Sequence, residues 1–162
     1  MAREYIVSGA ALTLANAAVT LAFVNPGTTM SLEFLRAWVS QAANATSAQQ
    51  RVQLSTQVTV FPTLVSATPA KTKLSDPVSA IVGGIAGAAG TCGINASAEG
   101  AGAKTVVLPD AFNVLNGWLW VPTPKETLVM NASAASGLGL HFPAAPTTLT
   151  SWNCGLVFGE LG

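Results

Sequence analysis

The chain has 162 residues and a mass of 16.4 kDa, which fits one domain able to bury a core without disulfides or a structural metal. Only 9% of its residues are charged, against roughly 25% in an ordinary soluble domain, and seven basic residues balance seven acidic ones. This balance argues against a nucleic-acid partner, which needs clustered Lys and Arg. So weakly charged a surface is expected to be covered in part by other subunits.

Residues 5–24 are predicted to form one or two strands. Apolar side chains alternate with smaller ones over residues 19–23, and the sequence Asn-Pro-Gly at 25–27 ends the run with a turn. The Ala-rich stretch 6–24 is interrupted by polar residues, so we do not interpret it as a signal sequence. No segment offers about 20 uninterrupted apolar residues, and we therefore expect no transmembrane helix.

Residues 30–41 fit either a helix or a strand, because Met30, Phe34 and Trp38 fall four positions apart. The segment that follows favours a strand: residues 49–60 alternate apolar and polar side chains, and a strand of this kind needs a partner close by. We therefore predict a long hairpin over residues 30–60. In its register Phe34 and Trp38 point inward, and Arg36 lies on the same apolar face, either at an edge or paired with a carboxylate.

Regular alternation fails over residues 61–104. Prolines punctuate the first part, and residues 81–102 consist mainly of Gly and Ala. The Gly-xxx-Gly spacing in this stretch is also found in membrane-helix dimers, but so much glycine disfavours a helix. A phosphate-binding loop is not indicated either, because the stretch has neither a Gly-Lys-Ser/Thr ending nor a GxGxxG pattern. We predict that residues 78–104 form a long loop or arm of a single domain, 1–162, and that this arm lies on a neighbouring subunit.

Residues 108–130 contain two of the four tryptophans and a turn signal. Asn-Gly at 116–117 supplies the positive φ that tight turns need, which predicts a hairpin. Trp118 and Trp120 are two positions apart, so they share one strand face, against a core or a neighbouring subunit. The Pro-x-Pro sequence at 122–124 cannot complete a hydrogen-bond ladder and marks the exit of the chain from the sheet, or an edge.

Two more strands complete the pattern. Leu138, Leu140 and Phe142 share a face opposite His141, and the apolar segment 150–161 is expected to be an inner strand. In total the sequence predicts about eight or nine short strands separated by Gly, Pro and Asn. This pattern favours an all-β fold, a single-domain β-sandwich or jelly roll, over any α/β arrangement.

Few residues indicate chemistry. His141 is the sole histidine, and its strand position suggests a surface or interface ring rather than part of a triad or a zinc site. The carboxylates are scattered singly, although two could meet in the fold as in a glycosidase. Cys92 and Cys154 match no metal or redox spacing, and we predict free, partly buried thiols rather than a disulfide. We therefore predict no enzymatic activity, no cofactor and no metal.

An interface is the function that the composition favours, because protein interfaces have weakly charged, apolar centres with aromatic anchors. The candidate interface residues are the two tryptophans of the turn segment and the isoleucines of the predicted arm: Trp118, Trp120, Ile81, Ile85 and Ile94. The alternative is that all four tryptophans fill one core.

A family resemblance rests on five stretches of sequence: LEFLRAWVSQA, QQRVQLSTQVTV, FNVLNGWLWVPTP, GLGL and VFGEL. In these stretches and in its low charge the chain resembles the head decoration or cement proteins of tailed bacteriophages, which are auxiliary capsid proteins. The resemblance implies a structural subunit of the virion, assembled in the host cytoplasm. It would form homo-oligomers, often trimers, bind the outer surface of the capsid and clamp neighbouring major capsid proteins.

Two other functions stay open. The first is a carbohydrate- or receptor-binding β-sandwich of a virion or cell surface, in which surface tryptophans stack on sugar rings. The second is a hydrolase whose carboxylates come together only in the fold.

Overall fold

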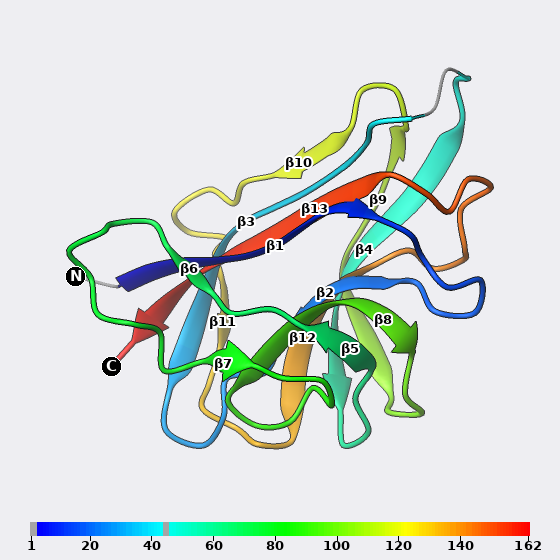
Figure 1. The fold of residues 1–162 in the computed structure, drawn as a ribbon. Coiled ribbons are helices and arrows are strands. Elements are labelled where there is room, and N and C mark those ends of the chain that lie inside the picture. The colour runs from blue at the N-terminus through cyan, green and yellow to red at the C-terminus, as the bar shows by residue number, and fades with distance from the viewer. Residues whose placement is uncertain (1–2, 44–45) are drawn as a thin grey trace.

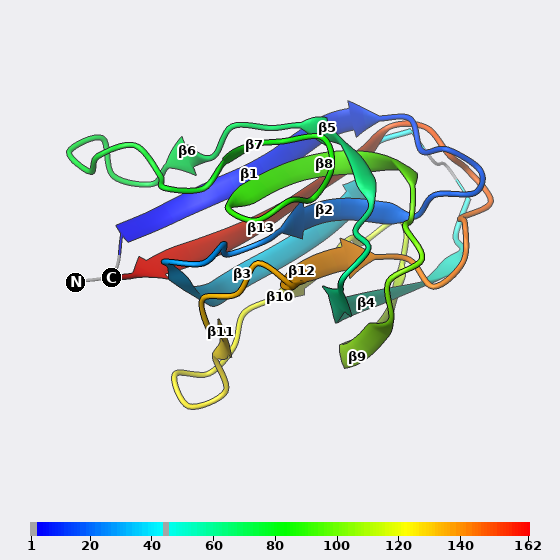
Figure 2. The same cartoon turned by 90° about the horizontal axis from the view of Figure 1, so that it is seen from below.

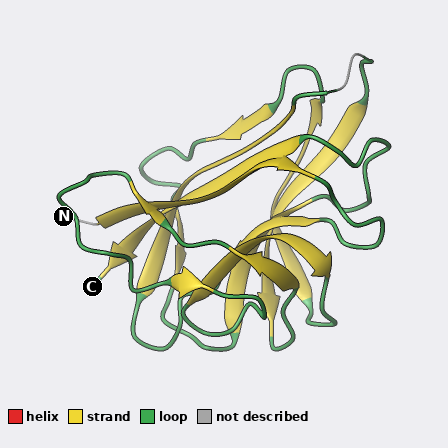
Figure 3. Ribbon diagram, in the orientation of Figure 1, coloured by secondary structure: helices red, strands yellow, loops and turns green. Residues whose placement is uncertain are grey.

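The computed structural model describes residues 3–43 and 46–162. Every regular element in these ranges is a β-strand (Figures 1 and 3). The strands form two sheets, and the main hydrophobic core lies where their inner faces meet. A smaller cluster contains Ala18, Phe23, Leu64 and Ala96. The predicted all-β sandwich is therefore confirmed.

The first sheet, called sheet A here, contains both ends of the described chain. Its strands are β1 (Arg3–Leu12), β3 (Ser31–Gln41), β6 (Ala70–Lys71), β10 (Trp118–Trp120), β11 (Leu128–Met130) and β13 (Trp152–Leu161). The order is β10–β3–β13–β1–β6, with β11 pairing with a second part of β3, and all pairs are antiparallel. In Figure 1 the red β13 lies between β1 and β3, which confirms that the last strand is an inner one.

The second sheet, sheet B, packs against the first. Its strands are β2 (Thr20–Val24), β4 (Gln49–Val58), β5 (Thr63–Ser66), β7 (Val82–Gly83), β8 (Thr91–Ala98), β9 (Lys104–Asn113) and β12 (Ser136–His141). The order is β5–β8–β2–β12–β4–β9, and β7 adds to β8 in parallel. Figure 2, seen from below, has β2, β8 and β12 in front of β3 and β13.

The core is built by alternate residues of the inner strands. On β13 the residues Trp152, Leu156 and Phe158 are fully buried, as the sequence pattern predicts. The ring of Trp152 meets Phe142 of the segment after β12 edge-on, with 4.9 Å between the ring centroids. Burying a side chain of this size contributes about 1.5–3 kcal/mol, so this aromatic contact is a main link between the two sheets.

The predicted hairpin over residues 30–60 is wrong. Strand β3 lies in sheet A beside β13, whereas β4 lies in sheet B between β12 and β9. Both strands do carry an apolar face, and both faces line the same core from opposite sides. The alternation of apolar and polar residues indicates which face of a strand is buried, but it does not identify the neighbouring strand.

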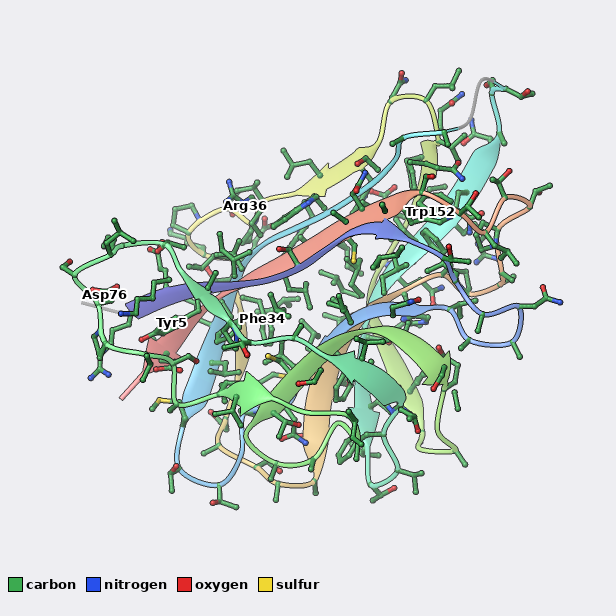
Figure 4. All side chains as sticks on the ribbon, viewed as in Figure 1. Tyr5, Phe34, Arg36, Asp76 and Trp152 are labelled. Atoms are coloured by element: carbon green, nitrogen blue, oxygen red, sulfur yellow. The ribbon has the colours of Figure 1, made fainter. Side chains whose placement is uncertain are left out.

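A β-bulge in β3 changes which side chains reach the core. Val157 of β13 pairs with Arg36 and the next residue pairs with Phe34, so Leu35 is an extra residue without an opposite partner. The inward positions therefore shift by one after Phe34, and Arg36 and Trp38 lie on the outer face of sheet A. Figure 4 shows Phe34 on the side of sheet B and Arg36 on the other side. The prediction that Arg36 and Trp38 face inward is thus wrong.

The Gly/Ala-rich stretch 78–104 is not an arm along its whole length. Residues 91–98 form β8, an inner strand paired with β2 and β5, and Ile81 and Cys92 belong to the core. The glycines serve close packing: a Cβ at Gly93 would lie 2.7 Å from the Cβ of Leu64. The predicted loop is correct for residues 84–90, which join β7 to β8.

The Asn-Gly turn joins the two sheets. Gly117 has φ +71°, as the turn prediction requires, but β9 before it pairs with β4 and β10 after it pairs with β3. The predicted hairpin is therefore a crossover between sheets. Residues 121–127, which contain Pro122 and Pro124, leave sheet A between β10 and β11, so the predicted exit of the chain is confirmed.

Strand β9 is a long and exposed edge strand of sheet B. It pairs with β4, and seven of its ten residues are exposed. Two features interrupt its ladder: Val107 is an extra residue between the paired positions Val106 and Leu108, and Pro109 has no backbone N–H.

Candidate functional site

The outer face of sheet A presents a row of larger side chains. Arg36 lies opposite Val157, Trp38 lies opposite Gly155, and Leu119 of β10 lies opposite Trp38. Directly opposed residues of neighbouring strands project on the same face. These side chains therefore form one continuous surface over β13, β3 and β10, turned away from the core.

Trp38 rests on β13 because position 155 is a glycine. A Cβ at Gly155 would overlap the indole ring of Trp38, so any other residue would displace the ring. The Cζ atom of Arg36 lies 5.6 Å from the ring centroid, a cation–π distance. The ring is half-buried, and Trp38 lines a small depression together with Arg36 and Leu119.

A larger hollow of about 530 Å³ adjoins this row. Its floor is Val157 and its walls come from β1, β3 and the Pro-containing segment: Glu4, Glu33, Leu35, Arg36, Val121, Pro122, Pro124 and Thr127. Three apolar side chains around it are more than half exposed, namely Leu119 (64%), Val121 (59%) and Val129 (54%). We call the hollow, Trp38 and these three side chains the sheet A surface.

A second hollow, of about 460 Å³, lies on the outer face of sheet B. Gln53 of β4 and His141 of β12 are directly opposed there. The remaining lining comes from the β1–β2 loop, the β8–β9 loop, β9 and the segment after β12: Asn16, Ala17, Val19, Glu99, Lys104, Val106, Phe142, Pro143, Ala144 and Ala145. We call this the sheet B hollow.

Glu99 ties the rim of the sheet B hollow to β2. Its Oε1 accepts hydrogen bonds from the backbone N–H groups of Val19 (2.7 Å) and Thr20 (2.6 Å). Its Oε2 accepts the Thr20 hydroxyl (2.7 Å) and pairs with Lys104. Burial alone would raise the pKa of Glu99, but the hydrogen bonds from Lys104 and Thr20 and the charge of Lys104 outweigh it and lower the pKa. The carboxylate is therefore ionised at neutral pH.

His141 is buried, not at the surface as the sequence suggests. Its side chain is 5% exposed, and its Nδ1 lies 3.0 Å from the Ser55 hydroxyl. Burial, together with the charge of Lys104, lowers the pKa of His141 to about 4, although Glu99 opposes this. Ser55 is 1% exposed and cannot reach a substrate, so this Ser–His contact holds the ring in place.

Cys92 and Cys154 are free and buried, which confirms the prediction of unpaired thiols. Their Sγ atoms contact the carbonyl oxygens of Ala67 (3.0 Å) and Leu21 (3.4 Å). Burial raises the pKa of both thiols to about 12, so both stay protonated at neutral pH.

The five predicted interface residues lie in different environments. Trp118 is 8% exposed and donates its indole N–H to Asp110 Oδ2 at 2.8 Å, while Ile81 lies in the core. Trp120 and Ile94 are partly buried and pack against that core. Ile85, on the loop before β8, is 64% exposed. Of the five, Ile85 is therefore the residue that the described chain leaves most open to a partner.

Sequence reasoning missed Trp38 and Leu119 as surface residues. Leu119 could have been found, since it alternates with the two inward tryptophans of β10. Trp38 could not, because its direction depends on the bulge at Leu35, which no turn or breaker residue announces in the sequence.

Within residues 3–43 and 46–162, no three His, Cys, Asp or Glu side chains are grouped so that they could hold a metal ion. The same part of the chain contains no helix of the length and hydrophobicity needed to span a membrane. In comparisons with known proteins, no family model matches the chain, and neither a curated protein nor a solved structure matches it.

Proposed function

We propose that the protein is a structural virion subunit, a decoration or cement protein of a tailed phage. It would bind the outer surface of the capsid, stabilise contacts between major capsid proteins and associate with itself, a trimer being the oligomer that the resemblance implies. The observation that supports this proposal is the sheet A surface, where Leu119, Val121 and Val129 are each more than half exposed.

The sheet A surface has the composition of a protein interface. Its centre is apolar and aromatic, and the charges around it are of both signs, because Arg36, Glu4 and Glu33 all line the hollow. Arg and Trp are the residues that most often dominate binding energy, and Arg36 and Trp38 lie next to each other here. A partner with a complementary apolar ridge would fit this surface.

The energy available per contact is modest. Covering three apolar side chains that are about half exposed contributes roughly 1 kcal/mol each. One subunit alone would therefore bind weakly through these residues. An oligomer that engages several sites of a lattice at once multiplies this energy, because later contacts form at high effective concentration.

Substitution of Leu119 by Glu tests the proposal. The change places a charge beside Trp38 in the sheet A surface without touching the core. The fold should therefore be retained while capsid binding falls at least about tenfold, the equivalent of 1.4 kcal/mol. The assay is co-sedimentation with capsids assembled from the major capsid protein encoded with the chain, together with sedimentation velocity of the chain alone.

Leu74→Glu is the matched control. Leu74 is 94% exposed and lies in the loop between β6 and β7, outside the sheet A surface, so its substitution should leave binding unchanged. The proposal fails if the unaltered chain stays monomeric at high concentration and does not co-sediment with capsids.

The alternative of a carbohydrate- or receptor-binding sandwich would need other residues than those first considered. Trp118 is buried, and Trp120 is partly buried and packs against the core, so neither is a freely exposed ring for a sugar. A sugar site would have to be sought elsewhere on the molecule.

A further inference from the structure

The floor of the sheet B hollow is polar and buried, and its hydrogen-bonding capacity is not used up. Gln53 and His141 are 9% and 5% exposed, and both line the hollow. The side-chain amide of Gln53 takes part in none of the hydrogen bonds found among the described residues. The oxygen and nitrogen of this amide are not among the enclosed polar atoms that lack a partner, so they open onto the hollow, where water or a ligand can bond to them.

The hydrogen bond between Ser55 and His141 determines what the imidazole offers. The Ser55 hydroxyl is buried, and its proton needs an acceptor, which Nδ1 of His141 provides at 3.0 Å. The proton of the neutral ring is therefore placed on Nε2 by the hydrogen-bond pattern. Because His141 lines the hollow, this N–H is a donor for a ligand there.

The rim and walls determine the charge of a suitable ligand. Lys104 and Glu99 form an ion pair, so the two charges compensate each other. Each oxygen of Glu99 already accepts two hydrogen bonds, whereas the Lys104 ammonium keeps further donors. The walls are apolar where Val19, Val106 and Pro143 line the hollow. Such a lining favours a neutral molecule with both polar and apolar surface.

We propose that the sheet B hollow binds a neutral sugar through one pyranose ring. Sugar hydroxyls act as donor and acceptor at once, which suits the Gln53 amide beside the His141 N–H, and the C–H groups of the ring pack on apolar walls. The volume of about 460 Å³ is ample for one ring. This site lies on the opposite sheet from the sheet A surface, so the inference goes beyond the proposed function and does not depend on it.

Nuclear magnetic resonance of the full chain tests the site. The probes are methyl α-glucopyranoside and N-acetylglucosamine, with sodium acetate as the anionic comparison, and the signals followed are the Gln53 side-chain amide and the His141 imidazole. Saturable shifts with a Kd on the order of 1 mM are expected for at least one pyranoside, since a ligand of this size gains modest affinity.

Gln53→Leu removes the amide while keeping a side chain of similar size, and it should weaken binding at least about tenfold or abolish it. Gln49→Leu is the matched control, because Gln49 lies on the same strand, is exposed and does not line the hollow. Val106→Trp, on the exposed edge strand, should fill the hollow and block binding. This second variant replaces Gln53→Leu in the test if Gln53→Leu does not fold.

Three results would overturn the proposal. Saturable binding of acetate without binding of either pyranoside would make the hollow an anion site. No response to any of the probes would leave it a solvent-filled hollow. If a folded Gln53→Leu or Val106→Trp variant binds the pyranoside as tightly as the original chain, the sugar binds elsewhere.

Discussion

At the scale of single residues, His141 makes the stability of the fold depend on pH. Its pKa of about 4 in the folded chain lies below the ordinary value of 6.5, so the unfolded chain takes up a proton first as the pH falls. Stability is therefore complete above about pH 6.5 and decreases towards pH 4. Between pH 7.5 and 5 the loss from this one group amounts to about 2 kcal/mol.

Substitution of His141 by Gln should remove this pH dependence, because Gln can still hydrogen-bond to Ser55 but does not titrate. Urea unfolding at several pH values between 7.5 and 5 measures it. The Glu99 carboxylate, whose pKa is lowered, titrates below this range and does not interfere. Parallel loss of stability in the original chain and in His141→Gln would show that another group is responsible.

At the scale of elements, the Gly/Ala-rich stretch contributes an inner strand. Deleting residues 81–102 would remove β8 from between β2 and β5 and take Ile81 and Cys92 out of the core. We expect the deletion variant to lose the cooperative thermal transition in circular dichroism, in contrast to what an arm would allow. A folded deletion variant would contradict the pairing of β8.

The sequence predicts a strand well where the pattern of apolar residues shows directly which of its side chains are buried. The C-terminal strand is inner because its alternate residues Trp152, Cys154, Leu156 and Phe158 are apolar and buried. Strand partners were less predictable: β3 and β4 follow each other in the chain, yet the energy of a shared core is the same whether they lie in one sheet or face each other across two.

The surface chemistry depends on details that a single sequence does not show. One bulge at Leu35 exchanges the inner and outer positions of β3 and so brings Trp38 to the outside. The glycines of residues 83–102 look like a flexible segment in sequence, but Gly93 of β8 permits close contact with Leu64 and Val65. The sheet B hollow joins residues from five separate segments, so only the fold reveals it.

At the scale of the whole molecule, the two proposed surfaces lie on the outer faces of opposite sheets. Leu119→Glu should therefore lose capsid binding and keep the response of Gln53 and His141 to pyranosides, while Gln53→Leu should do the reverse. The two assays already described measure this independence. Loss of both activities in either variant would indicate a change of the fold rather than of one surface.

The interrupted edge of β9 also limits strand pairing between copies of so weakly charged a chain. Strand-to-strand templating between copies needs a regular row of free N–H and C=O groups, and the extra Val107 and the missing N–H of Pro109 break that row. The shape of this one strand therefore opposes edge-to-edge polymerisation of the chain at β9.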